Sequence, residues 1–179
     1  TELITGLDLV EQMIRVAAGE KLSFAQADVK REGWAMECRI NAEDPFRNFL
    51  PSTGRLVRFD PPAQNLFQGQ ATTDLGVRVD TGVIDGGEIP MFYDSMIAKL
   101  IVHGTDRLDA ITKMREALNG FVIRGVGSNI PFQSALLAHP KFVAGDFNTG
   151  FIAENYAAGF RSEDVPHDDP DFLVALAAF

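Results

Sequence analysis

The eight residues from Trp34 to Asn41 alternate between two sets of side chains, which is the period of a β-strand with one buried face. One set is apolar and the other is mostly polar: Trp34, Met36, Cys38 and Ile40 against Ala35, Glu37, Arg39 and Asn41. Two acids then precede Pro45, which ends the strand because proline has no N–H to donate. The chain therefore needs a sheet with a core on one side of this strand.

The polar row of this strand has two interpretations. Glu37, Arg39 and Asn41 are either a solvated strand face or the wall of a site. In a site, neighbouring acids would hold the planar fork of Arg39 toward a ligand. The spacing alone leaves both interpretations open.

Composition narrows the class of protein. A chain of 179 residues with 46% hydrophobic and 23% charged residues is one domain, with at most a short extra piece. The net charge of −9 argues against a nucleic-acid partner, and no apolar run reaches the ~20 residues of a membrane span. The single cysteine, Cys38, is predicted to be a small core residue and fits a reducing compartment.

Periodicity and turn residues predict an α+β fold, with an antiparallel, sheet-rich middle between an N-terminal helix and a helical C-terminal third. We expect a core helix at 4–18 with Thr5 and Asp8 at its start, strands at 34–43, 55–59, 77–83 and in 91–103, a loop at 63–73, a short strand at 121–124, and helices at 106–120, 129–138, 149–158 and from 168 onward. Residues 1–160 would form one domain. Residues 161–179 would be a linker and the beginning of a following domain, and the opening at Thr1 suggests a piece of a longer protein.

Most signatures of chemistry are missing from the sequence. It has no GxxxxGK[ST] or GxGxxG phosphate loop, and no arrangement typical of a nucleophile with its base. His103, His139 and His167 lack the spacing of zinc ligands. The remaining candidates are Arg39 with its acids, and Asp94 next to Tyr93. An arginine can stabilise a developing oxyanion, but it activates nothing alone.

Four motifs together resemble one family. They are GLDLVEQMIRVAAG at 6–19, ECRINAEDP at 37–45, LPSTG at 50–54 and YDSMIAKLI at 93–101. In this order they are similar to the C-terminal domain of biotin carboxylase, a component of biotin-dependent acyl-CoA carboxylases, over residues 1 to about 160. The details TGLDLV, EGWAMECR, GVRVDTG and FVIRGVGSNI most resemble the alpha subunits of propionyl-CoA carboxylases.

The resemblance implies a role for Arg39. In the family, ATP phosphorylates bicarbonate, and the resulting carboxyphosphate yields carbon dioxide and a phosphate base that deprotonates biotin. Arg39 matches the arginine that holds the biotin ureido oxygen and stabilises the enolate, beside the bicarbonate. Asp94 lies in a matching motif and receives a supporting role. Glu37 and Glu43 are expected to orient Arg39, a hypothesis from the strand face.

The resemblance also implies what lies outside this chain. ATP, magnesium and bicarbonate would be bound mainly by an ATP-grasp part preceding Thr1, so no metal ligand is expected here and the chain alone should be inactive. Implied partners are a biotin carrier domain, a carboxyltransferase beta subunit and the rest of the biotin carboxylase subunit, with no nucleic acid or membrane. The expected location is the bacterial cytoplasm or the mitochondrial matrix. Alternatives are an acetyl-CoA or 3-methylcrotonyl-CoA carboxylase, or a structural module in which Arg39 only pairs with acids.

Overall fold

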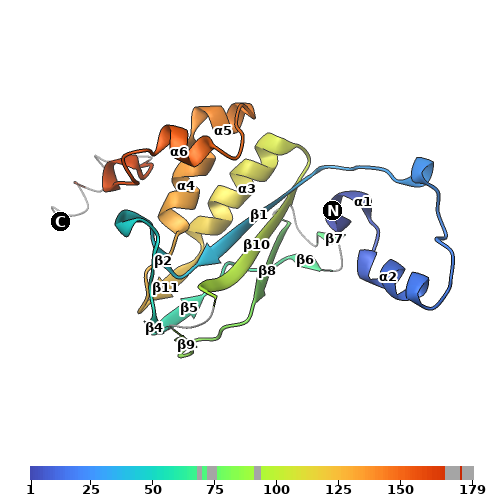
Figure 1. Cartoon of the computed structure of the whole chain (residues 1–179), viewed down its shortest axis with the longest axis horizontal. Coiled ribbons are helices and arrows are strands. Elements are labelled where there is room, and N and C mark those ends of the chain that lie inside the picture. The colour runs from blue at the N-terminus through green and yellow to red at the C-terminus, as the bar shows by residue number, and fades with distance from the viewer. Residues whose placement is uncertain (68–69, 72–75, 91–93, 168–173, 175–179) are drawn as a thin grey trace.

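A three-stranded antiparallel sheet forms the centre of the computed structural model, which describes residues 1–67, 70–71, 76–90, 94–167 and 174 (Figure 1). Its strands are β1 (Trp34–Asn41), β10 (Met96–Gly104) and β8 (Val77–Thr81), in the order β1-β10-β8. Arg39 lies opposite Lys99, and Lys99 lies opposite Asp80. The alternation of residues 34–41 is therefore the period of a real strand, and the predicted α+β class is confirmed.

One face of the sheet packs on helix α3 (Arg107–Asn119), as Figure 1 shows. Ile40, Leu100 and Val102 from the sheet and Met114 and Leu118 from the helix are almost completely buried. Helix α3 begins where predicted because the Asp106 carboxylate caps it, accepting a hydrogen bond from the backbone N–H of Asp109. Cys38 belongs to this core, as predicted.

The C-terminal third is helical, with α4 (Ile130–Ala138), α5 (Pro140–Ala144) and α6 (Phe151–Asn155). A second, smaller core of Phe132, Ala135 and Phe160 lies here, with Phe49, Tyr156 and Val165 packed against it. Val165, in the segment predicted to be a linker, thus packs on the domain. The helix predicted from residue 168 lies outside the described residues, apart from Val174.

Short strand pairs complete the fold. They are β2 (Glu43–Asp44) with β3 (Leu50–Pro51), β4 (Gly54–Arg55) with β9 (Glu88–Ile89), β5 (Arg58–Asp60) with β11 (Val122–Arg124), and β6 (Leu66–Phe67) with β7 (Gln70–Ala71). Two predictions are corrected here. The strand expected at 55–59 is divided, because β4 and β5 pair with different partners. The loop expected at 63–73 contains the β6–β7 pair.

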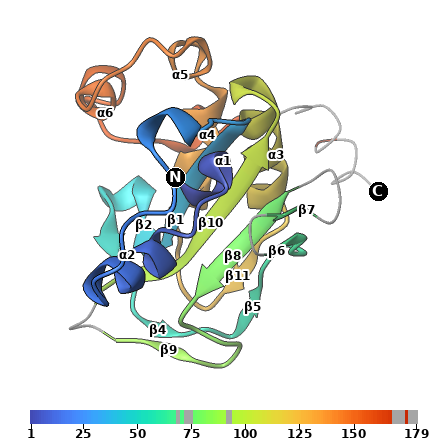
Figure 2. The ribbon, with the colours of Figure 1, turned by 90° about the vertical axis from the view of Figure 1, so that its right-hand side faces the viewer.

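The N-terminal helix differs most from its prediction. It is divided into α1 (Glu2–Thr5) and α2 (Leu9–Ala17), because Gly6 takes a left-handed conformation and Asp8 caps α2 by accepting from the backbone N–H of Glu11. The predicted core role is wrong for the described residues, because α2 buries none of its side chains. Figure 1 shows α2 standing away from the sheet, joined to β1 by an extended connection, and in Figure 2, where that side faces the viewer, α2 lies in front of the sheet.

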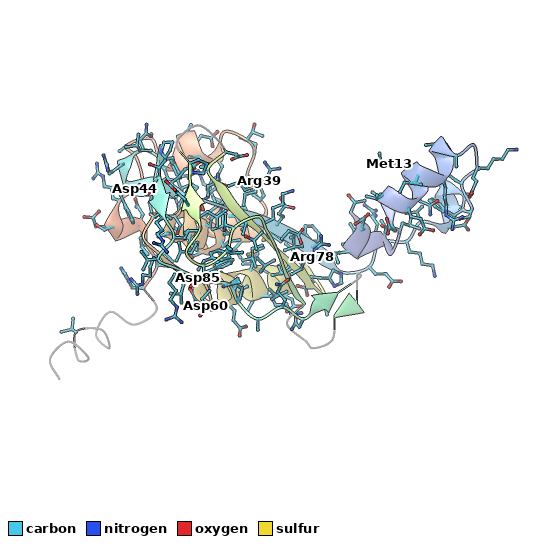
Figure 3. The ribbon with its side chains drawn as sticks, turned by 90° about the horizontal axis from the view of Figure 1, so that it is seen from below. Met13, Arg39, Asp44, Asp60, Arg78 and Asp85 are labelled. Atoms are coloured by element: carbon cyan, nitrogen blue, oxygen red, sulfur yellow. The ribbon has the colours of Figure 1, made fainter. Side chains whose placement is uncertain are left out.

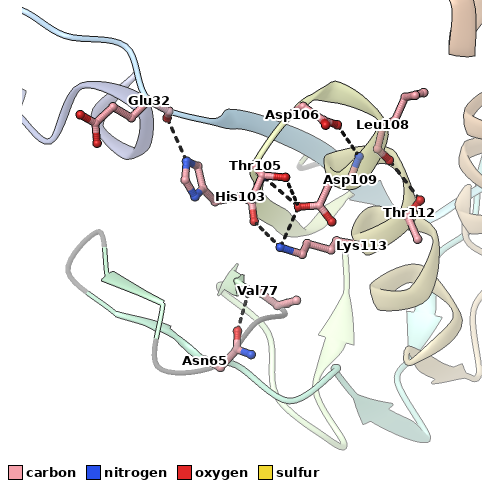
Figure 4. Close-up of polar contacts among 10 residues, drawn as sticks. All are labelled: Glu32, Asn65, Val77, His103, Thr105, Asp106, Leu108, Asp109, Thr112 and Lys113. Carbon is pink, nitrogen blue, oxygen red and sulfur yellow. Dashed lines mark hydrogen bonds and ion pairs between the residues drawn. The ribbon is translucent and has the colours of Figure 1, made fainter.

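Polar contacts fix the far end of the central sheet (Figure 4). The ring Nε2 of His103 lies 3.1 Å from the carbonyl oxygen of Glu32, which joins the N-terminal connection to β10. Asp109 Oδ2 accepts from the Thr105 backbone N–H at 2.8 Å and pairs with Lys113 Nζ at 3.0 Å. These contacts hold this end of the sheet in place, and Arg39 is not among their partners.

Candidate functional site

Arg39 lies on the face of the sheet opposite α3, in a row of charged residues that crosses three strands. Its side chain is 68% exposed, and its Nε lies 3.5 Å from Glu37 Oε1. Figure 3 shows Arg39 and Arg78 on this part of the molecule, away from Met13 on α2. The β-strand period places Arg39 here, because Cys38 and Ile40 on either side of it point into the core.

Lys99 is the nearest residue across the strands from Arg39. Asp80 lies on the other side of Lys99. Its carboxylate accepts two hydrogen bonds from the Arg78 guanidinium, at 2.8 and 2.7 Å, and these bonds raise the pKa of Arg78. No ion pair of Lys99 is found in the part of the chain that the structure describes. Like charges directly opposite each other on a sheet are unfavourable, so the Arg39–Lys99 pair favours an anionic ligand.

A second cluster lies at the end of β1. Glu43 Oε1 accepts from Ser95 Oγ at 2.6 Å and from Asn41 Nδ2 at 3.2 Å. The structure therefore places Glu37 against Arg39, and Glu43 against Ser95 and Asn41. Asn41 Oδ1 is buried without a hydrogen-bond partner in the described chain.

The other predicted candidate, Asp94, is exposed and lies two residues before β10, which begins at Met96. Its Oδ1 accepts a hydrogen bond from the backbone N–H of Met96 at 3.0 Å, so it shapes the turn that leads into the strand carrying Lys99. Tyr93 lies outside the described residues.

Cys38 does not supply a nucleophile. Burial, with a smaller contribution from the charge of Glu37, raises the pKa of its thiol to about 12. The thiol is therefore neutral at physiological pH, whereas the thiolate is the reactive form.

Sequence reasoning missed two groups of residues at this site. Lys99 is a lone cation within the apolar run from Met96 to Val102, a signal that marks the strand's less buried face. Asn129 and Gln133 reach the backbone of Arg39 from α4, and no local pattern indicates that contact.

The chemical contribution of this site is the positive charge of Arg39 and Lys99. Within the described residues, no three His, Cys, Asp or Glu side chains gather in a way that suits a metal ion. No described helix has the length and apolarity of a membrane crossing. Arg39 and Lys99 can stabilise negative charge on a ligand that lies on this exposed face of the sheet.

Comparison with known proteins defines the family. The family model described as Biotin carboxylase C-terminal domain matches residues 37–154, and the chain belongs to this family. The propionyl-CoA carboxylase alpha chain of Ruegeria pomeroyi is 54% identical over 99% of this chain and 28% of its own length. Biotin carboxylase 1 of Bacillus subtilis is 49% identical over 85% of this chain and 32% of its own length.

A solved structure gives the same assignment. The biotin carboxylase domain of Hydrogenobacter thermophilus 2-oxoglutarate carboxylase, in complex with MgADP, ADP and bicarbonate, superposes with a TM-score of 0.78. It is 37% identical, over 94% of this chain and 34% of that one. The chain therefore spans only about a quarter to a third of these similar proteins.

Proposed function

We propose that this chain is the C-terminal part of the biotin carboxylase component of a biotin-dependent acyl-CoA carboxylase, and that Arg39 donates hydrogen bonds to the ureido oxygen of biotin. The supporting observation is the placement of Arg39 on an open sheet face, with Lys99 opposite it and Glu37 at 3.5 Å. The sequence motif around Arg39 lies within the matched family region.

The electrostatics suit this role. When the ring nitrogen of biotin is deprotonated, negative charge develops on the ureido oxygen, and a planar guanidinium can direct N–H donors toward it. Lys99 adds a second positive charge beside the same position. The carboxylate of Glu37 lies close to Arg39 Nε, so Glu37 can orient the guanidinium.

Other parts of the reaction are proposed to lie outside the residues that the structure describes. Biotin, attached to a carrier domain, would supply the nitrogen that is carboxylated. ATP, magnesium and bicarbonate would be held mainly by an ATP-grasp part of the parent protein; the similar 2-oxoglutarate carboxylase domain, of which this chain covers 34%, was solved with MgADP and bicarbonate. The chain alone is therefore expected to show no ATP-dependent carboxylation.

Replacement of Arg39 in the parent biotin carboxylase subunit tests this proposal. Arg39→Ala should lower the rate of ATP-dependent biotin carboxylation by about 10²-fold or more, because loss of one donor to a developing oxyanion commonly costs 10²–10³ in rate. The matched control is Arg58→Ala, which removes an exposed arginine paired with Asp60 on β5 and should leave the rate unchanged. A near-normal rate for Arg39→Ala would favour the alternative, a structural module in which Arg39 is an ion-pairing residue.

Propionyl-CoA is the proposed final acceptor, since the alpha chain of a propionyl-CoA carboxylase shares 54% identity with this chain. The assembled parent complex should carboxylate propionyl-CoA with a higher kcat/KM than acetyl-CoA or 3-methylcrotonyl-CoA. A preference for either of those thioesters would change the assignment of the complex without changing the role of Arg39. The carrier domain and a carboxyltransferase beta subunit are the proposed partners.

We also propose that helix α2 docks on the rest of the biotin carboxylase subunit. Val10, Met13 and Ile14 are 62%, 70% and 65% exposed and form one apolar face, which is unusual for a surface without a partner. Helix α2 lies before residue 37, where the family match begins, and the match to this chain covers only 28% and 32% of the two similar proteins. The remainder of the same polypeptide is therefore the proposed occupant.

A further inference from the structure

Helix α4 begins beside the edge of β1, next to Arg39. Asn129 is the N-cap residue of α4 and is only 6% exposed. An asparagine at this position usually accepts a hydrogen bond from the first turn of its own helix. The Asn129 side chain makes no such bond here, so its amide serves another purpose.

The Asn129 amide binds the backbone of β1 on both sides of Ile40. Its Oδ1 accepts from the Asn41 N–H at 2.9 Å, and its Nδ2 donates to the Arg39 carbonyl at 3.0 Å. The backbone N–H of Asn129 also donates to the Asn41 carbonyl at 3.1 Å. Because β1 is an edge strand with β10 on its other side, the side-chain amide occupies the place of a missing neighbouring strand.

Gln133, one turn further along α4, reaches the same point. Its Nε2 donates to the Arg39 carbonyl at 3.2 Å, so this oxygen accepts two side-chain amide hydrogen bonds. We call Asn129 and Gln133 the α4 clamp. The clamp spans the point where the β1–β10 pairing shifts register, between Ile40 and Asn41, so it supports the backbone on the side of Arg39 where the ladder is irregular.

We propose that the α4 clamp positions Arg39 for its ligand. The inference rests on the proposed function of Arg39. The Arg39 side chain is 68% exposed, and among the described residues its one ion pair is with Glu37 at 3.5 Å, so the place of its guanidinium depends strongly on its backbone. A displacement of ~1 Å in a catalytic group can cost about 10²-fold in rate. Asn129 and Gln133 are thus positioning residues, and they do not touch the ligand themselves.

The test uses the parent biotin carboxylase subunit with Asn129→Asp. This change keeps an acceptor for the Asn41 N–H but replaces the donor to the Arg39 carbonyl with an oxygen. We expect kcat for biotin carboxylation to fall about tenfold or more, with the KM for ATP unchanged, since misplacement weakens transition-state contacts. The control is Asn155→Asp, which loses the same kind of amide–carbonyl bond, to Phe151 at 2.8 Å in α6, and should keep normal activity.

A double variant separates positioning from mere stabilisation. If the clamp acts through Arg39, Arg39→Ala with Asn129→Asp should be no slower than Arg39→Ala alone. A normal kcat per folded molecule for Asn129→Asp, with only a lower Tm, would overturn the inference, as would effects that multiply in the double variant. If Asn129→Asp does not fold, Gln133→Ala decides, with a reduced kcat expected and a normal one contradictory. An active Arg39→Ala would instead refute the proposed function.

Discussion

The apolar face of α2 should contribute little to stability in this chain alone and much more in the parent biotin carboxylase subunit. Met13 and Ile14 are 70% and 65% exposed in this chain, and α2 contains no buried residue. We consider the double substitution Met13→Gln with Ile14→Gln. Glutamine is a good helix former, so the change removes apolar surface without breaking the helix.

The magnitude follows from the exposed fractions. Full burial of such a side chain stabilises by roughly 1.5–3 kcal/mol. About two thirds of each side chain is still available, so docking should gain about 1–2 kcal/mol per residue and about 2–4 kcal/mol for both. In this chain alone, where both side chains are exposed, the double substitution should change the free energy of unfolding by only about 0.5 kcal/mol or less.

Hydrogen exchange of the α2 amides measures this difference. In the parent subunit the variant should lose roughly 30- to 700-fold of amide protection, which corresponds to 2–4 kcal/mol at 1.4 kcal/mol per tenfold change. Glu11→Gln on the polar face of α2 is the control, and its exposed pairing with Arg15 predicts a small effect. Equal protection in the variant and the unsubstituted parent would refute the docking of this face.

Three further results are expected from the chain itself. Cys38 should react slowly with iodoacetamide at pH 8 and rapidly after unfolding, because burial raises the pKa of its thiol to about 12; fast labelling of the folded chain would contradict its burial. Met114→Ala should lower the free energy of unfolding by about 2–5 kcal/mol in urea titrations, since the side chain is fully buried between α3 and the sheet. The Thr105 N–H and then Lys113 lower the pKa of Asp109, so its stabilisation is present above about pH 4 and lost as pH falls through the folded pKa. Asp109→Asn should therefore destabilise the chain at pH 7, and this loss should shrink as the pH falls below about 4; a loss that does not change with pH would be contrary to this assignment.

The elements that sequence patterns predicted well are those with both a period and an end signal. Strand β1 alternates from Trp34 to Asn41, with Pro45 shortly after it, and α3 has Asp106 as its cap. The exposure of the apolar face of α2 was not predictable from the sequence. An amphipathic pattern shows that a face needs a partner without showing that the partner is present. The division of residues 54–60 into β4 and β5 depends on pairing with β9 and β11, which are distant in the sequence.

The same limit applies to the candidate site. The face of Arg39 followed from the alternation of β1, but spacing alone left open whether that face is solvated, and the motifs of the family supported the other interpretation. Lys99 meets Arg39 only through the β1–β10 register. Asn129 reaches Arg39 across 90 positions of sequence, so a helix N-cap signal predicts the wrong use of its side chain.

The most direct test of the central claim is a crystal structure of the parent biotin carboxylase subunit with biotin bound. We expect the ureido oxygen to lie about 2.7–3.1 Å from a guanidinium nitrogen of Arg39, the range of charge-assisted and oxyanion hydrogen bonds. Asn129 and Gln133 should still donate to the Arg39 carbonyl in that complex. Biotin bound with its ureido oxygen on other donors, away from this face of β1, would refute the proposed role of Arg39.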